Sequence, residues 1–495
     1  MPEEKEWTVM VFHAGDNNLS EEMLFSLKEM KRAGANPQVN LIALFDPNEP
    51  GVPTQRFVLN THAENPPDGL LINDLRLDVT GFPPFAGELN AGDPQVIADF
   101  IRAGIKFFPA RHYMVVLSGH GPGDVDNGFL MTDEHPFKEG DPSRPQQDAL
   151  TLAELMDIFV KLKADLAKDG LAVGQPGVKA KIDILGIDCC LISSAEVCLQ
   201  LSEHVDLLVG PQGFEPNLGW PYQEVLSQLM RNPALTPEEM AVGIVDEYAR
   251  YYFDYVLAGR SVDMSVCNLR NAAPLTQAIQ TLAETLLKAL PDPPPADTPD
   301  VNNAALNALI LAHWESQGYK FDQFADLFDF CDRLEQRCQG ADDLSGDIRT
   351  ACQGVKNVLS GGGPAERFVM KCCTSGRTFQ YSNGLSIFLP WALPASLEYA
   401  DLKLAQETSW DTLINRYVAN SRRSARPGVA SPPLPPGFDS PTKNRDSPTK
   451  NRGSDMPGPM KNPPLLWKMS RALFDLFNPG GGQAGGGAAG PAEED

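Results

Sequence analysis

Several apolar runs in this chain lack the polar alternation of a half-exposed strand. They are rich in Val, Ile and Leu, which is typical of strands whose sheet is covered by helices on both faces. Helical periods separate the runs, so the sequence predicts an α/β fold, an αβα sandwich with a largely parallel central sheet. The predicted strands are residues 8–13, 39–45, 56–59, 113–117, 181–187, 207–209, 262–267, 368–372 and 385–389.

The intervening segments carry helix start signals. Thr151 and Glu154 form the pattern of a capping box, and Asn17-Asn18 offers a cap for the first helix. Residues 301–359 are mostly helical in pattern and predict a helical insertion, because strands do not alternate with helices there. The other predicted helices are residues 20–33, 94–107, 151–166, 193–202, 222–229, 237–252 and 272–289.

Charge and composition exclude several classes of protein. The 495 residues hold 41 Lys and Arg against 65 Asp and Glu, a net charge of −24, which argues against nucleic acid as the main partner. No run approaches the ~18 apolar residues of a membrane span, and no signal peptide is present, so we expect a cytoplasmic protein. The nine cysteines are odd in number and irregularly spaced. They predict mostly buried, reduced thiols rather than disulfides or zinc knuckles.

The composition changes near residue 420. Residues 1–420 are expected to form the main domain, and 421–462 a disordered, Pro-rich linker that contains the tandem repeat Asp-Ser-Pro-Thr-Lys-Asn-Arg. Residues 463–478 predict an amphipathic helix with an apolar side between Leu465 and Phe477. This side would dock on a protein partner, on the chain's own catalytic domain or on a membrane surface, for which its few charges give little attraction. A Gly-rich acidic tail, 479–495, completes the chain.

Two strand ends carry reactive side chains. His120 follows the strand 113–117 and is flanked by glycines, including Gly121. Cys190 follows the strand 181–187 just before a predicted helix, whose N-terminus would lower the pKa of the thiol. Each residue alone could be a turn histidine or a buried thiol. Together, at the carboxyl ends of neighbouring strands, they indicate a Cys–His dyad.

Five ordered segments resemble the clostripain family of cysteine peptidases, in the same broad group as caspases, gingipains and legumain. The resemblance implies a caspase-haemoglobinase-like fold and a cysteine endopeptidase that cleaves protein or peptide substrates after Arg or Lys. It implies no required cofactor. The matching segments are residues 7–19, 118–121, 188–191, 215–222 and 383–390.

The same resemblance suggests roles for individual residues. Cys190 aligns with the family nucleophile and Cys189 with a small-residue position, while the backbone amides of Gly121 and Cys190 match an oxyanion hole. Asp188 matches the acid at the base of the specificity pocket, although its position also suits a helix cap. Glu215 would either supplement that acid or orient the loop that contains Trp220.

Two further expectations concern the connection between the His and Cys strands. Related enzymes are often cut there, so Lys138 and Arg144 are candidate self-cleavage sites in an exposed loop. Some relatives use calcium, for which Asp124, Asp126 and Asp133 are candidate ligands. Their spacing lacks the glycine and terminal glutamate of an EF-hand, which favours an ordinary solvated loop.

Two other functions are compatible with the sequence. One is a catalytically silent scaffold that recruits partners through its tail, and the other is a different cysteine-dependent acyl transfer, such as transpeptidation. The presence of His120, Cys190 and Asp188 argues against the silent scaffold.

Overall fold

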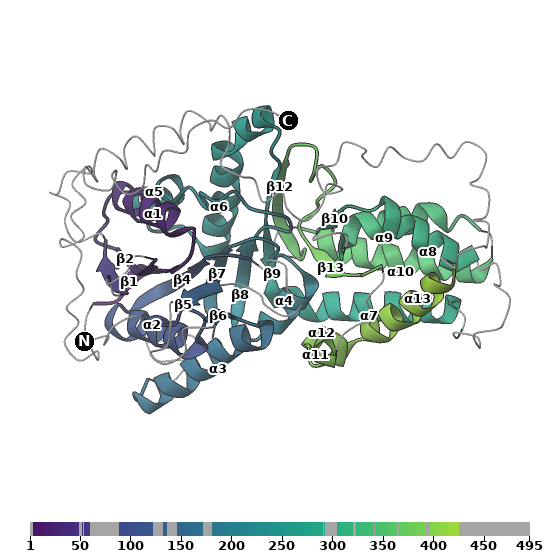
Figure 1. The fold of residues 1–495 in the computed structure, drawn as a ribbon, viewed down its shortest axis with the longest axis horizontal. Helices are drawn as coiled ribbons and strands as arrows, with labels where there is room; N and C mark the ends of the chain where they lie inside the picture. The colour runs from purple at the N-terminus through teal and green to yellow at the C-terminus, as the bar shows by residue number, and fades with distance from the viewer. Residues whose placement is uncertain are drawn as a thin grey trace, which may run out of the picture.

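The central feature of the structure, a computed structural model, is an eight-stranded sheet (Figure 1). The neighbouring strands β2, β1, β4, β7 and β8 are parallel, whereas β3 and β9 at the flanks run antiparallel to the strands they join. The predicted α/β class with a largely parallel sheet is therefore confirmed. The strands in spatial order are β12 (Val369–Ser375), β9 (Val262–Asn268), β8 (Val205–Gly210), β7 (Ile182–Asp188), β4 (Ala110–Ser118), β1 (Lys5–Gly15), β2 (Val39–Pro47) and β3 (Gln55–Val58).

The structure describes most of the chain before residue 425. The described residues are 3–48, 52, 54–59, 89–121, 132–135, 146–171, 181–290, 292, 304–319, 323–340, 342–363, 366–391 and 397–424. The self-cleavage candidates Lys138 and Arg144 lie outside them, as do the predicted docking helix and the acidic tail. No helix within the described ranges is long and apolar enough to span a bilayer.

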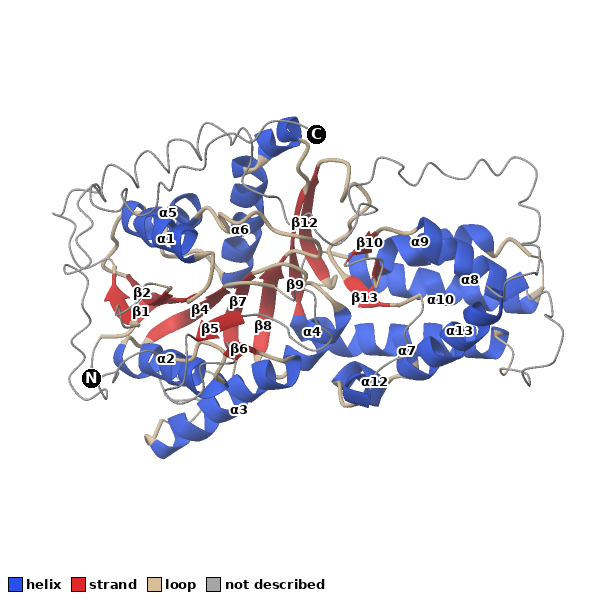
Figure 2. Ribbon diagram, viewed as in Figure 1, coloured by secondary structure: helices blue, strands red, loops and turns tan. Residues whose placement is uncertain are grey.

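Helices cover both faces of the sheet (Figure 2). Alternate residues of β1 belong to opposite layers: Val9 and Val11 pack with the α1, α5 and α6 side, and Met10 and Phe12 with the α2 and α3 side. This arrangement explains the strand's unbroken apolar run. The helices of the two layers are α1 (Ser20–Arg32), α5 (Tyr222–Arg231) and α6 (Pro237–Tyr251) on one face, and α2 (Pro94–Phe107), α3 (Leu152–Lys168), α4 (Ala195–Leu201) and α7 (Ala272–Ala289) on the other.

Local capping explains where several helices begin. The hydroxyl of Thr151 accepts a hydrogen bond from the Glu154 amide while the Glu154 carboxylate accepts one from the Thr151 amide, so the predicted capping box is confirmed. At α2, the Asp93 side chain caps the helix, and Pro94 occupies the first turn, where no amide donor is needed.

A second group of helices packs beside α7, on the right of Figure 1. Buried residues of this group, among them Phe330, Val355 and Tyr417, belong to the same hydrophobic core as one face of the large sheet. The segment 301–359 is mostly helical, and it also supplies two strands of a small antiparallel sheet, β10-β11-β13. The elements here are α8 (Ala304–Glu315), β10 (Gly318–Tyr319), β11 (Phe324–Asp326), α9 (Leu327–Arg337), α10 (Asp343–Ser360), β13 (Ser386–Phe388), α11 (Leu397–Ala400), α12 (Lys403–Glu407) and α13 (Trp410–Ser424).

Shorter elements lie at the edges of this framework. Strands β5 (Thr132–His135) and β6 (Gln146–Ala149) follow β4 and precede α3 in the sequence, and they form an antiparallel pair. The 3₁₀ helices are η2 (Phe253–Ala258) and η3 (Leu269–Asn271).

Candidate active site

The register of two central strands brings His120 and Cys190 together. In the pairing of β4 with β7, Ser118 lies opposite Asp188, so His120 and Cys190 each lie two residues beyond matched strand ends. Adjacent strands are separated by about 4.8 Å. Gly121 lies directly against Cys190: a Cβ atom at Gly121 would lie 2.4 Å from the Cys190 carbonyl oxygen and 2.6 Å from its amide nitrogen. Only glycine fits at this position without moving the backbone.

The imidazole of His120 has a partner that the sequence analysis did not identify as functional. Its Nε2 atom lies 2.5 Å from the Oδ1 atom of Asn18, in the loop after β1. Because an amide oxygen only accepts, Nε2 donates in this contact, and Nδ1 of the neutral ring is then an acceptor. The expectation that Asn17-Asn18 caps α1 is wrong, because the N-cap residue is Leu19 and no side chain caps this helix. The Asn17 side chain accepts the Leu19 amide at 2.8 Å, and Asn18 contacts the histidine.

The two adjacent thiols differ in environment. Cys189 is 2% exposed and packs in the core, and Cys190 is only partly buried and lines the pocket. The Cys190 Sγ atom accepts a hydrogen bond from the Glu215 amide at 3.3 Å. The pKa of the Cys190 thiol is raised to about 12, mainly by burial and also by the nearby carboxyl groups of Glu215 and Asp188, while the hydrogen bond from the Glu215 amide lowers it.

The expectation that a helix N-terminus lowers the pKa of Cys190 is therefore wrong. Helix α4 begins at Ala195, several residues beyond the thiol, and its first turn is capped by Ser194, whose hydroxyl accepts the Val197 amide. The same observation excludes Asp188 as the cap of this helix.

Asp188 lies at the buried end of the pocket and accepts three hydrogen bonds. The donors are the Trp220 amide at 3.0 Å, the Tyr222 hydroxyl at 2.8 Å and the Ser118 hydroxyl at 3.1 Å. Burial nevertheless raises the pKa of Asp188 to about 6. Gly219 covers the carboxylate with φ of 62°, and a Cβ atom there would lie 2.6 Å from Asp188 Oδ1.

Glu215 presents a second buried carboxylate to this pocket. Within the described part of the chain, neither of its carboxyl oxygens makes a hydrogen bond of ordinary geometry, although the Tyr248 hydroxyl and the Asp188 carboxyl lie beside it. Burial and the charge of Asp188 raise the pKa of Glu215 well above its ordinary value. The Trp220 amide bonds to Asp188. The role of Glu215, as a second acid of the pocket or as a residue that orients this loop, stays a prediction.

One pocket therefore joins the reactive pair to two acidic groups. Its walls come from α1, from the ends of β4 and β7, and from the loop before α5. The lining residues are Leu19, Glu22, Met23, Ser26, Ser118, Gly119, His120, Gly121, Asp188, Cys189, Cys190, Glu215, Pro216, Asn217, Leu218 and Gly219.

The described residues do not test the candidate calcium ligands or the candidate self-cleavage sites. Among the described residues, no group of three or more His, Cys, Asp or Glu side chains could hold a metal ion. Asp133 lies in β5, and Asp124 and Asp126 lie outside the described ranges, so the expectation of a solvated loop rather than a calcium site stays untested. Lys138 and Arg144 fall in the sequence between the paired strands β5 and β6.

Comparison with known proteins identifies related sequences and folds. Residues 11–417 match the sequence model of the clostripain family. Clostripain from Hathewaya histolytica is 22% identical over 430 residues, which span 77% of this chain and 74% of that protein. A secreted C11 cysteine protease from Bacteroides thetaiotaomicron, solved with an irreversible peptide inhibitor, has a TM-score of 0.53 and 17% identity, covering 82% of this chain and 99% of its own. An inactive zymogen C11 protease from Parabacteroides distasonis has a TM-score of 0.50 and 20% identity, with the same coverage.

Proposed function

Because the chain belongs to the clostripain family of cysteine peptidases, we propose that it cleaves peptide bonds after Arg or Lys, with Cys190 as nucleophile and His120 as general base. Its class as a cysteine-type endopeptidase follows from the family. The residue roles rest on the register that places His120 and Cys190 at matched strand ends.

The proposed reaction begins from a protonated thiol, because burial holds the pKa of Cys190 far above neutrality. Nδ1 of His120 takes the thiol proton as Sγ forms a bond to the substrate carbonyl carbon, whose π electrons move to oxygen. The amides of Gly121 and Cys190 would stabilise that oxyanion. The imidazolium then protonates the leaving amine as the C–N bond breaks. Water attacks the resulting thioester with His120 again as base, which releases the acid and restores the thiol.

The observation that supports a basic substrate is the pair of buried carboxylates in the pocket. Asp188 already has three hydrogen-bond donors, whereas among the described residues no donor makes a hydrogen bond of ordinary geometry to the Glu215 oxygens. A substrate guanidinium or ammonium would offer donors to Glu215 and positive charge to both groups. In this proposal Glu215 makes the direct hydrogen bonds and Asp188 supplies charge at the base of the pocket.

Labelling with a peptidyl-arginine acyloxymethyl ketone tests this function. The probe should modify Cys190, located by mass spectrometry of the digested protein. The matched control is the norleucine analogue, which has an uncharged side chain and should react at least ~100-fold more slowly, since a buried charge pair lost costs about 2–5 kcal/mol. Equal rates for the two probes would refute the basic specificity, and modification of Cys189 would show that the nucleophile assignment is displaced by one residue.

We also propose activation by self-cleavage at Lys138 or Arg144. The relative from Parabacteroides distasonis is described as an inactive zymogen, which supports a processed form in this fold. Both residues lie between β5 and β6, whose pairing would hold the two new ends near each other. Intact-mass analysis should detect two chains for the wild-type protein and one chain for Cys190→Ala. A single chain in both would contradict the proposal.

A further inference from the structure

The loop after the nucleophile is held in an unusual backbone conformation. Leu191 has φ of 61°, a region that residues with a Cβ atom rarely occupy, so the surrounding structure must impose it. Three backbone hydrogen bonds of 2.8–2.9 Å tie the amides of residues 191–193 to the carbonyl groups of Pro211 and Gly213. The Glu215 amide contacts Cys190 Sγ. The segment 211–215 is therefore the support on which the Cys190 loop rests.

Gln212 anchors this supporting segment from its centre. Its side chain is 1% exposed, and its polar atoms are bonded on both sides: Nε2 donates to Asp326 Oδ2 at 3.0 Å, and Oε1 accepts the Gly384 amide at 2.7 Å. Its backbone amide donates to Asp263 of β9 at 2.6 Å. The backbone amide of Gln212 thus bonds to the large sheet, whereas its side chain bonds to Asp326 at the start of α9 and to Gly384 just before β13.

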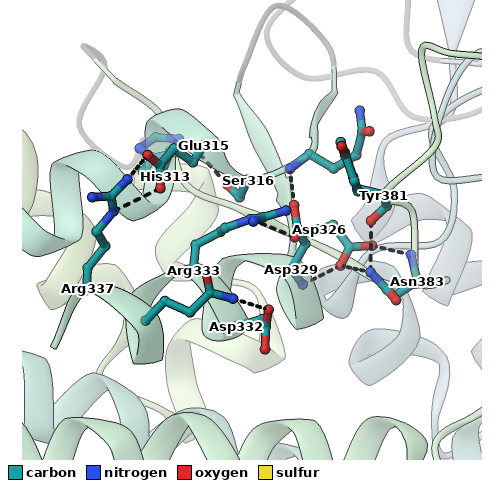
Figure 3. Close-up of polar contacts among 12 residues, drawn as sticks. His313, Glu315, Ser316, Asp326, Asp329, Asp332, Arg333, Arg337, Tyr381 and Asn383 are labelled. Carbon is teal, nitrogen blue, oxygen red and sulfur yellow. Dashed lines mark hydrogen bonds and ion pairs between the residues drawn. The ribbon is translucent and has the colours of Figure 1, made fainter. Parts of the chain in front are cut away.

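Asp326 receives the side chain of Gln212 from the other region of the fold. It is fully buried at the start of α9, where its Oδ1 atom caps the helix by accepting the Asp329 amide at 2.8 Å. Figure 3 shows Asp326 between Asp329 and Asn383. The backbone amide of Asn383 donates to Asp326 Oδ2 at 2.6 Å, and its side-chain nitrogen donates to Oδ1 at 3.1 Å. Capping needs only one oxygen, and the bond to Gln212 uses the other.

An apolar contact from the same region reaches Leu191 itself. Leu191 forms a small buried cluster with Tyr319 of β10 and Phe379. The partly buried Cys190 side chain packs against this cluster. A Cβ atom at Gly213 would lie 2.3 Å from the Phe379 ring, so the supporting segment and this cluster are in tight contact.

From these contacts we propose that Gln212 and Asp326 are positioning residues, which hold the Cys190 loop in its catalytic geometry and make the region around α9 a part of the active site. The inference rests on the proposed role of Cys190. Loss of the Gln212–Asp326 bond would let the supporting segment shift, and small displacements of a nucleophile lower the rate of the chemical step strongly.

The test compares Gln212→Met and Asp326→Asn with two matched controls in the full-length protein. Asn caps helices as well as Asp, so Asp326→Asn keeps the cap. Its new side-chain NH2 group, however, faces two other donors, Gln212 Nε2 and the Asn383 amide. The control Asp342→Asn changes the cap of α10, which bonds only within its own helix start, and Gln200→Met changes a buried glutamine that bonds to Met156 and Lys403. Turnover is measured per active site titrated with the peptidyl-arginine probe, together with KM.

Both test variants should lower kcat by about 10- to 100-fold with KM within about threefold, and the double variant should fall no further than the worse single one. The controls should keep kcat. Unchanged kcat per titrated site in Gln212→Met or Asp326→Asn, or multiplicative effects in the double variant, would overturn the positioning role. An inactive wild-type protein would instead refute the proposed function.

Discussion

At the scale of single residues, the two neighbouring cysteines differ in their access to substrate. Cys190→Ala should abolish cleavage of arginine-terminated reporter peptides, because the remaining cysteine of the pocket wall, Cys189, is only 2% exposed. Cys189→Ala should keep most of the activity, since its side chain packs in the core and points away from the chemistry, with Sγ 3.9 Å from the Leu117 carbonyl oxygen. Initial rates with a fluorogenic peptide test both variants. An inactive Cys189→Ala protein with an intact melting curve would reverse the assignment.

The pKa of Asp188 predicts how cleavage depends on pH. Burial raises this pKa from 3.8 to about 6, so the group is mostly neutral below pH 6 and ionised above it. We expect kcat/KM for arginine substrates to rise through pH 6 as the carboxylate appears. In Asp188→Asn the contribution of Asp188 to that limb should vanish, and kcat/KM at pH 7.5 should fall at least ~100-fold, because removing one charged group from a buried ion-pair network costs about 3–5 kcal/mol.

The same pKa has a consequence for stability with the opposite sign. Because the folded-state pKa lies above the unfolded one, Asp188 contributes stability that is fully present below pH 3.8 and is lost as pH rises through about 6. Chemical denaturation at several pH values gives the free energy of unfolding, and the Cys190→Ala background prevents self-cleavage during the measurement. The free energy of unfolding should fall with rising pH in Cys190→Ala, and less so in the double variant that also carries Asp188→Asn. If the pH profile of activity is identical in Asp188→Asn and the wild type, the titration belongs to another group.

At the scale of elements, the close approach of the β4 and β7 ends depends on a glycine. In Gly121→Ala the new methyl group would collide with the backbone of Cys190, so we expect kcat to fall at least ~100-fold with little loss of secondary structure. The control is Gly354→Ala in α10, where a Cβ atom meets nothing within 4 Å. That change should raise stability by about 1 kcal/mol through helix propensity and leave turnover unchanged. Full activity in Gly121→Ala would mean that the two loops are not held together as described.

At the scale of the whole molecule, helix α13 continues to Ser424, a few residues into the segment expected to be linker. Its residues Trp410, Ile414 and Tyr417 are buried in the common core. A chain ended after Ser424 should therefore fold and keep its activity. A chain ended after Thr408 should not fold, because loss of one buried Trp side chain alone costs about 3–5 kcal/mol.

Melting curves and peptide cleavage by the two truncated proteins test this division of the chain. The same experiment addresses the predicted docking helix between Leu465 and Phe477, which lies outside the described residues. Any protein that binds through that helix should co-purify with the full-length chain and be absent from the chain ended after Ser424. Loss of activity in the chain ended after Ser424 would place part of the tail within the catalytic domain.

Local patterns in the sequence predicted most elements, because strand periodicity and helix capping depend on neighbouring residues. The bounds of α2 and α7 agree with the predicted 94–107 and 272–289, and the capping box of α3 is present. The short strands β5, β6, β10 and β11 were missed, since a few residues carry too little periodicity. The predicted strand at 385–389 is β13, but it joins the small sheet rather than the large one, which only strand pairing could decide.

By itself the sequence placed His120 and Cys190 at strand ends, and its resemblance to a known family named Asp188 and Glu215 as candidate substrate-binding residues. The structure gathers all four around one pocket. Only the tertiary structure decided the environment of each group: the raised pKa of the thiol, the three donors to Asp188 and the burial of the Glu215 carboxyl group beside Asp188. The contacts of Asn18 with His120 and of Gln212 with Asp326 join residues 102 and 114 positions apart. No local pattern encodes such contacts, because burial and hydrogen bonding there are set by segments that meet only when the chain is folded.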